Sequence, residues 1–132
     1  MKAEKEKQQN LNFEIEFLEK LLDINPNYVD ALTLLGELFT RNKEFQKALE
    51  IDLKLAEFKP QDAIVFYNLA CDYSLLDKKT LGLKALEKAF QLGYADLDYL
   101  IKDQDLKNLR ESKRFQTLIE TWKNKNLSSN IS

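Results

Sequence analysis

Residues 31–60 read ALTLLGELFTRNKEFQKALEIDLKLAEFKP, and residues 65–94 read VFYNLACDYSLLDKKTLGLKALEKAFQLGY. The only two prolines of the chain, Pro26 and Pro60, lie 34 residues apart (60 − 26 = 34). A fixed period of this length is typical of a repeated helix–turn–helix unit. The sequence therefore predicts a fold built from repeated pairs of helices.

Small residues recur with the same period and predict where the paired helices touch. Gly36 and Ala48 in the first stretch correspond to Ala70 and Gly82 in the second, each 34 positions later. A large side chain at a close helix contact would hold the two backbones apart. We therefore expect these four positions to lie where the helices of each pair approach most closely.

Apolar residues at helical spacing indicate two antiparallel helix pairs. The expected helices span residues 29–41, 44–58, 63–75 and 78–92. With only 3 Gly and 2 Pro, the chain has too few turn residues for an all-β fold. The sequence thus predicts an all-α protein.

Residues 26–92 resemble the tetratricopeptide repeat family. The residues that carry the resemblance are Leu32, Leu35, Gly36, Phe39, Ala48, Pro60, Phe66, Leu69, Ala70, Tyr73 and Ala89. The resemblance implies a solenoid of antiparallel helix pairs in a single domain, residues 1–132. Its expected parts are an N-terminal half repeat (10–25), two full repeats (29–62 and 63–94) and capping helices (95–126). The last part is similar to a segment that often follows such repeats in bacterial proteins.

The chain departs from the family pattern at three kinds of position. Gly82 and Leu55 replace alanines, and Tyr94 replaces the closing proline. Asp52 stands where the family prefers an aromatic residue. Because a buried carboxylate must be hydrogen-bonded, we expect Asp52 to bond to the next helix, where the candidate donors are Tyr67, Asn68 and Tyr73.

The composition favours a non-catalytic protein. The 132 residues contain no histidine and one cysteine, which excludes a histidine-based triad and a zinc site of Cys and His ligands within the chain. There is no glycine-rich phosphate loop, so we expect neither a cofactor nor a metal. The N-terminus lacks an apolar signal segment and no run is long enough to span a bilayer, so we expect a cytoplasmic protein without membrane contact.

Members of the family bind peptides or helices along the first helix of each repeat. The resemblance places that groove at Asp30, Thr33, Glu37, Thr40, Arg41, Ile64, Tyr67, Asn68, Cys71, Ser74 and Leu75. Of the clamp that other members use for acidic chaperone tails, only Asn68 matches, and Glu37 would repel a carboxylate. The expected partner is a protein or peptide with an apolar segment and a basic flank. Cys71, beside the acidic Asp72, is expected to be a packing residue rather than a reactive thiol.

The first helix carries an apolar arc wider than one neighbouring helix can cover. Its inner stripe is Leu11, Ile15, Leu18 and Leu22. The outer part of the arc is Phe13, Phe17, Leu21 and Ile24. An exposed patch of this kind usually marks a contact, so the alternative function is self-association through this helix, with a homodimer as one outcome.

Charge is uneven along the chain although the net charge is −2. Residues 102–125 carry 7 basic and 4 acidic side chains, a net charge of +3. This basic end either contacts an acidic partner or forms a solvated helix face. A nucleic-acid-binding protein usually has a denser basic patch, so we expect no nucleic acid partner.

Overall fold

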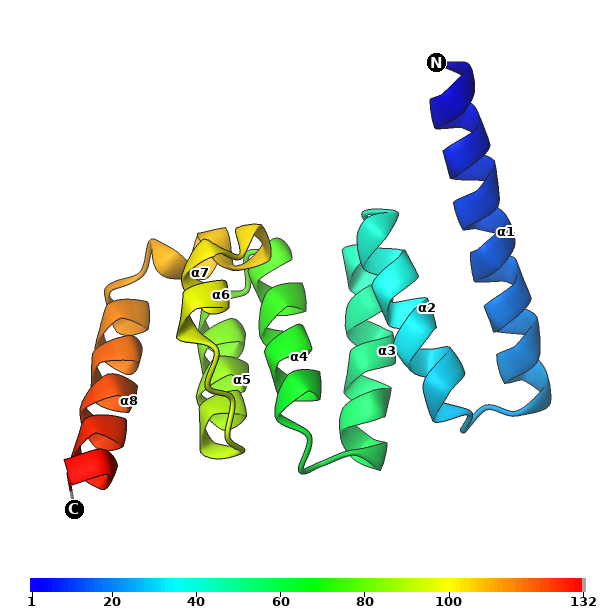
Figure 1. Ribbon diagram of the computed structural model, residues 1–132. Helices are drawn as coiled ribbons and strands as arrows, with labels where there is room; N and C mark the ends of the chain where they lie inside the picture. The colour runs from blue at the N-terminus through cyan, green and yellow to red at the C-terminus, as the bar shows by residue number, and fades with distance from the viewer. Residues whose placement is uncertain (132) are drawn as a thin grey trace. The chain divides into compact units, whose positions relative to one another are not determined.

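A computed structural model describes the backbone of residues 1–131 and the side chains of residues 1–126. This part of the chain is helical and contains no strand (Figure 1), which confirms the all-α prediction. The helices are α1 (Lys2–Ile24), α2 (Val29–Arg41), α3 (Phe45–Phe58), α4 (Ala63–Leu75), α5 (Lys79–Gln91), α6 (Leu97–Lys102), the 3₁₀-helix η1 (Gln104–Leu106), α7 (Lys107–Arg110) and α8 (Lys113–Ile131). The four repeat helices begin and end within one residue of the expected bounds.

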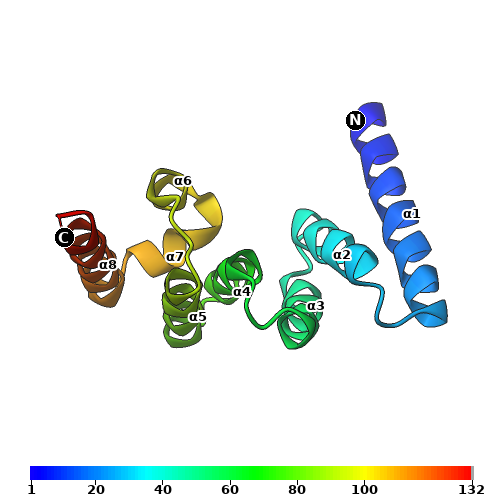
Figure 2. The same cartoon turned by 60° about the horizontal axis from the view of Figure 1, so that its bottom comes forward.

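The helices group into two compact units, unit 1 (residues 1–60) and unit 2 (residues 61–132). In unit 1, α2 pairs with α3, and α1 packs against α2. In unit 2, α4 pairs with α5 (Figure 2). In the same unit η1 and α7 lie against α4, and α8 lies against α5. The expected antiparallel pairs are thus confirmed, and the assignment of the whole chain to one domain stays a prediction.

The turn inside each helix pair repeats in conformation as well as in sequence position. Lys43 and Asp77, 34 residues apart (77 − 43 = 34), have φ angles of 60° and 57°. In each turn the backbone amide of the following residue donates a hydrogen bond to the preceding helix. Glu44 N donates to Phe39 O (2.8 Å), and Lys78 N donates to Tyr73 O (2.8 Å). This hydrogen bond closes the helix end and requires a left-handed residue, for which glycine is the usual choice.

Lys43→Gly should raise the stability of unit 1 by about 0.5–1 kcal/mol, because glycine adopts a positive φ without the Cβ strain that lysine carries. Urea denaturation of the two proteins measures the difference. Lys43→Ala is the matched control, since alanine keeps the Cβ and should give no gain. Equal stability of the glycine variant and wild type would show that this turn is not strained.

The two glycines of the repeat pattern lie at close helix contacts. A Cβ built on Gly36 would lie 3.0 Å from Oδ1 of Asp52 on α3. A Cβ on Gly82 would lie 2.9 Å from Cδ2 of Leu109 on α7 and 3.4 Å from Cβ of Tyr73 on α4. Both positions therefore need a small residue, as the pattern predicts.

Asp52 is buried, and its carboxylate occupies the space that the missing side chain of Gly36 leaves beside α2. This contact lies within its own unit. The hydroxyl of Tyr67, one of the donors expected for Asp52, instead donates to Asp103. The expectation for that donor was wrong, because the hydroxyl has a single proton and donates it to Asp103.

Candidate functional site

The groove positions on α2 form one exposed face of unit 1. Asp30, Thr33, Glu37 and Arg41 are exposed, and Thr40 is half-buried. Their spacing of three and four residues places them on the same side of the helix. Both threonine hydroxyls of this face donate hydrogen bonds to backbone oxygens of α2: Thr33 to Val29 O (3.0 Å) and Thr40 to Gly36 O (3.2 Å). The carboxylates and the guanidinium therefore supply the charge of this face.

The groove positions on α4 in unit 2 are mostly covered. Tyr67, Cys71 and Ser74 are buried, with 5%, 7% and 0% of their surface exposed. Asn68 and Leu75 are half-buried, and Ile64 at the start of the helix is exposed. A partner therefore finds little of this face accessible in unit 2.

The part of the chain that covers α4 is residues 96–110, here called the covering segment, which contains α6, η1 and α7. Its Asp103 accepts a hydrogen bond of 2.5 Å from the hydroxyl of Tyr67 and lies 3.8 Å from Sγ of Cys71, both through Oδ2. Asn108 donates to the backbone oxygen of Ser74 at 2.8 Å. Three of the expected groove residues are thus partners of the chain itself.

Leucines and hydrogen bonds hold the covering segment in place. Leu100, Leu106 and Leu109 are completely buried. The other oxygen of Asp103 accepts the amide of Asp105 (3.0 Å), which caps η1. Arg110 Nη1 donates to the backbone oxygens of Asp103 (2.6 Å) and Leu100 (3.2 Å). These contacts fix the carboxylate of Asp103 over α4.

Aromatic rings complete the cover. The ring of Tyr67 stacks on that of Tyr94, with centroids 4.4 Å apart and planes at 11°. Tyr99 on α6 lies with its ring centroid 6.2 Å from that of Tyr67. Such pairs stabilise by about 0.5–1.5 kcal/mol beyond the area they bury. Tyr94, which takes the place of the family's closing proline, therefore contributes to fixing Tyr67.

The cover changes the chemistry of the buried hydroxyl and thiol. Burial, followed by the hydrogen bond to Asp103, raises the pKa of Tyr67 well above its usual value. Burial and the nearby charge of Asp103 raise the pKa of the Cys71 thiol in the same way. Because the thiolate is the nucleophilic form, this cysteine has the environment of a packing residue rather than of a catalytic one.

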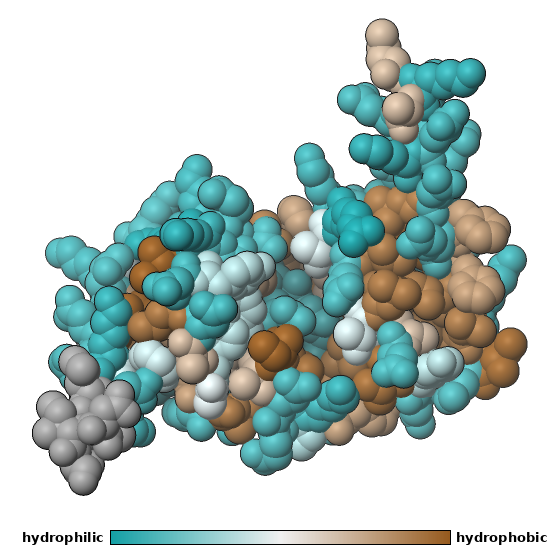
Figure 3. All heavy atoms as spheres, in the orientation of Figure 1, coloured by the Kyte–Doolittle hydropathy of each residue, from teal (hydrophilic) through white to brown (hydrophobic). Residues whose placement is uncertain are grey.

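The outer face of α1 is apolar and exposed. Ile15 and Leu18 on the inner face are buried in the core of unit 1, and the half-buried Leu21 packs against the same core. Phe13, Phe17 and Ile24 are 70%, 54% and 84% exposed. Figure 3 shows apolar side chains gathered over this helix. Three of the four residues expected for self-association thus lie together on an open surface, and Leu21 belongs partly to the core.

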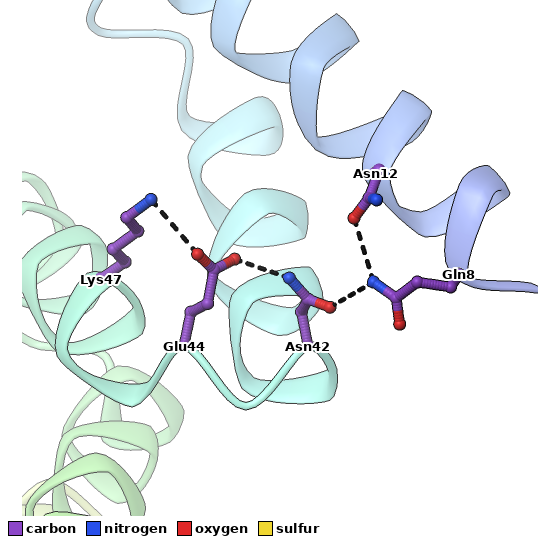
Figure 4. A network of polar contacts seen from close by, with 5 residues as sticks. All are labelled: Gln8, Asn12, Asn42, Glu44 and Lys47. Atoms are coloured by element: carbon purple, nitrogen blue, oxygen red, sulfur yellow. Dashed lines mark hydrogen bonds and ion pairs between the residues drawn. The ribbon is translucent and has the colours of Figure 1, made fainter.

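A polar network fixes the N-terminal half of α1 against the turn between α2 and α3 (Figure 4). Gln8 Nε2 donates to Oδ1 of Asn42 at 2.8 Å and to Oδ1 of Asn12 at 3.0 Å. Asn42 donates to Glu44 (2.7 Å), which pairs with Lys47 (3.2 Å). The bond from Asn42, with Lys47, lowers the pKa of Glu44. The helix begins at Lys2, before the expected residue 10, and this network anchors the additional turns.

Comparison with known proteins identifies the fold. A sequence model described as a tetratricopeptide repeat matches residues 17–50, which run from the second half of α1 through α2 into α3. The solved structure of MamA 41-end from Desulfovibrio magneticus RS-1 is similar, with a TM-score of 0.65 and 21% identity. Residues 17–50 thus match a tetratricopeptide repeat, and the chain has the fold of a tetratricopeptide repeat protein. The similarity covers 86% of this chain and 67% of that MamA chain. The MamA RS-1 ArsTM double mutant gives a TM-score of 0.64 at 19% identity, over 87% and 69% of the two chains.

A curated relative shares part of this sequence. This relative, a chloroplastic protein from Arabidopsis thaliana, is 38% identical over 90 residues. The match covers 66% of this chain, which spans only 27% of the length of that relative. In the described part of the chain, no helix is long and apolar enough to cross a membrane.

Proposed function

We propose that this tetratricopeptide repeat protein is a non-catalytic adaptor that binds a peptide or helix of a protein partner on the exposed face of α2. Repeats of this family are protein-interaction scaffolds, and the chain has their fold. The observation that supports the α2 face is its exposure, in contrast to the buried positions of α4. The partner therefore contacts unit 1.

The charges of the α2 face favour a partner with basic residues. Asp30 and Glu37 lie seven residues apart, about two turns or ~10 Å along the helix. Arg41 closes the face at the end of α2. A segment with a basic flank complements the two carboxylates, and charge complementarity of this kind sets specificity and association rate.

Asp30→Lys/Glu37→Lys should weaken partner retention in an affinity purification at least about tenfold, because it places like charges opposite a basic segment. Both side chains are exposed, so the fold should be unchanged. The matched control is Glu50→Lys/Glu57→Lys on α3, which changes the net charge equally at two exposed positions outside the groove. Equal loss in both variants, or retention in both, would contradict the assignment of the α2 face.

The exposed stripe on α1 supports a second candidate function, self-association. Phe13, Phe17 and Ile24 lie on one exposed face of the helix, opposite its packed face, with Lys20 between Phe17 and Ile24. Burying it between copies would remove this surface from water, which stabilises an assembly by about 25 cal/mol per Å². In this alternative the protein is a structural or assembly component.

The cytoplasmic location expected from the sequence stays a prediction, since the name of the Arabidopsis relative places that relative in the chloroplast.

A further inference from the structure

The apolar stripe on α1, defined by Phe13, Phe17 and Ile24, has an acidic border. Residues 12–24 contain four carboxylates, Glu14, Glu16, Glu19 and Asp23, and one lysine, Lys20. At about 100° per residue, Glu16 and Asp23 lie along one side of the stripe and Glu14 along the other, while the exposed Lys20 lies on the stripe between Phe17 and Ile24. The surface is therefore an apolar ridge that carries one lysine and is flanked by negative charge.

Unit 2 contains a groove between α5 and α8 whose border carries mainly positive charge. Two adjoining hollows of ≈370 and ≈330 Å³ share Glu87, Leu118 and Thr121 as walls. Apolar side chains line the groove: Leu83, Phe90, Leu118 and Trp122. The basic side chains on its rim are Lys84, Lys113, Arg114 and Lys125, with Glu87 as the acidic one. The lining also includes the polar Thr117, Thr121, Gln91 and Asn126, so the groove joins an apolar strip to polar walls, with an excess of positive charge.

We infer that the stripe on α1 of one molecule docks into the α5/α8 groove of a second copy, giving a head-to-tail assembly. Laying an apolar helix face in a groove is a common recognition mode. The carboxylates beside Phe13 and Phe17 meet the basic rim, and this complementarity selects the groove over a second α1, whose acidic border would repel. The inference rests on the self-association proposed for α1 and adds the surface that receives it.

The two surfaces also match in length. Phe13 and Ile24 are 11 residues apart, ~16 Å along α1 at 1.5 Å per residue. The groove runs along α8 from Lys113 to Asn126, 13 residues or ~20 Å. Because stripe and groove are different surfaces, each docked copy leaves one of each free, so assembly continues beyond the dimer.

Two variants test the inference by sedimentation of the full chain. Phe13→Glu/Phe17→Glu removes the stripe and keeps the groove, whereas Lys113→Glu/Arg114→Glu reverses the rim and keeps the stripe. Each should weaken self-association at least about tenfold. The matched control Lys102→Glu/Lys107→Glu changes two exposed lysines of unit 2 outside the groove and should assemble as wild type does. Far-UV circular dichroism verifies folding, and Lys84→Glu/Lys113→Glu replaces the rim variant should that one fail to fold.

Mixing the two variants gives the decisive result. The intact stripe of the rim variant should dock into the intact groove of the stripe variant, so the mixture forms a 1:1 heterodimer that cannot extend. If the rim variant still self-associates like wild type and the mixture shows no heterodimer, the groove assignment is overturned while self-association stands. A wild type that is monomeric at every concentration would remove self-association itself, and the α2 face would be unaffected.

Discussion

Gly82→Leu should destabilise unit 2 by about 1–3 kcal/mol or more, because the new side chain overpacks a filled helix contact. A Cβ at this position already lies 2.9 Å from Leu109 and 3.4 Å from Cβ of Tyr73. A leucine therefore forces α7 or α4 away from α5. The denaturation midpoint followed by the fluorescence of Trp122, the only tryptophan of the chain, measures the effect in this unit.

A size exchange separates overpacking from a general intolerance of leucine at this position. Leu109→Ala alone should cost about 2–5 kcal/mol, since it deletes a completely buried side chain. In Gly82→Leu/Leu109→Ala the new leucine enters the space that the old one leaves. The cost of the double variant should therefore be clearly smaller than the sum of the two single costs. Additive costs would show that the two positions do not share this space.

Asp103→Ala should destabilise the covering segment by about 2–4 kcal/mol, combining the loss of a charged hydrogen bond with the loss of a helix cap. The hydroxyl of Tyr67 and the amide of Asp105 both lose their acceptor. Urea denaturation measures the change. Asp105→Ala is the matched control, because Asp105 contributes its backbone amide, and not its carboxylate, to the cap. Equal stability of the Asp103 variant and wild type would contradict the role of this carboxylate.

The repeat made the helix pairs and their contacts predictable. A 34-residue period fixes which positions correspond, so Gly36 and Gly82 were placed at helix contacts from the sequence. The same local rules placed Phe13 and Phe17 outside the core of unit 1, because an arc that wide exceeds what one neighbouring helix covers. What covers them depends on the surface of a second molecule, which the pattern of one helix does not describe.

The cover over α4 was not predictable in the same way. Tyr67 and Asp103 are 36 residues apart, a separation that is not a repeat period. The short helices of the covering segment show too few turns for a clear apolar period. The family pattern assigns the groove from register alone, so it names Tyr67, Cys71 and Ser74 without information on what lies above them. The one local signal in this segment is the set of leucines Leu100, Leu106 and Leu109, which is typical of buried positions but does not identify the surface that they bury.

Binding on the face of α2, as proposed above, depends on one structural feature: the chain's own C-terminal segment closes the repeat face of unit 2. The labelling rate of Cys71 by an alkylating reagent at pH 8 tests it most directly, since this residue is the only thiol and lies beneath Asp103. We predict labelling at least about a hundredfold slower in the native protein than in the urea-unfolded chain, because the reagent must wait for the cover to open. Labelling of the native protein at the rate of the unfolded chain would show that the face of α4 is open and would contradict the account.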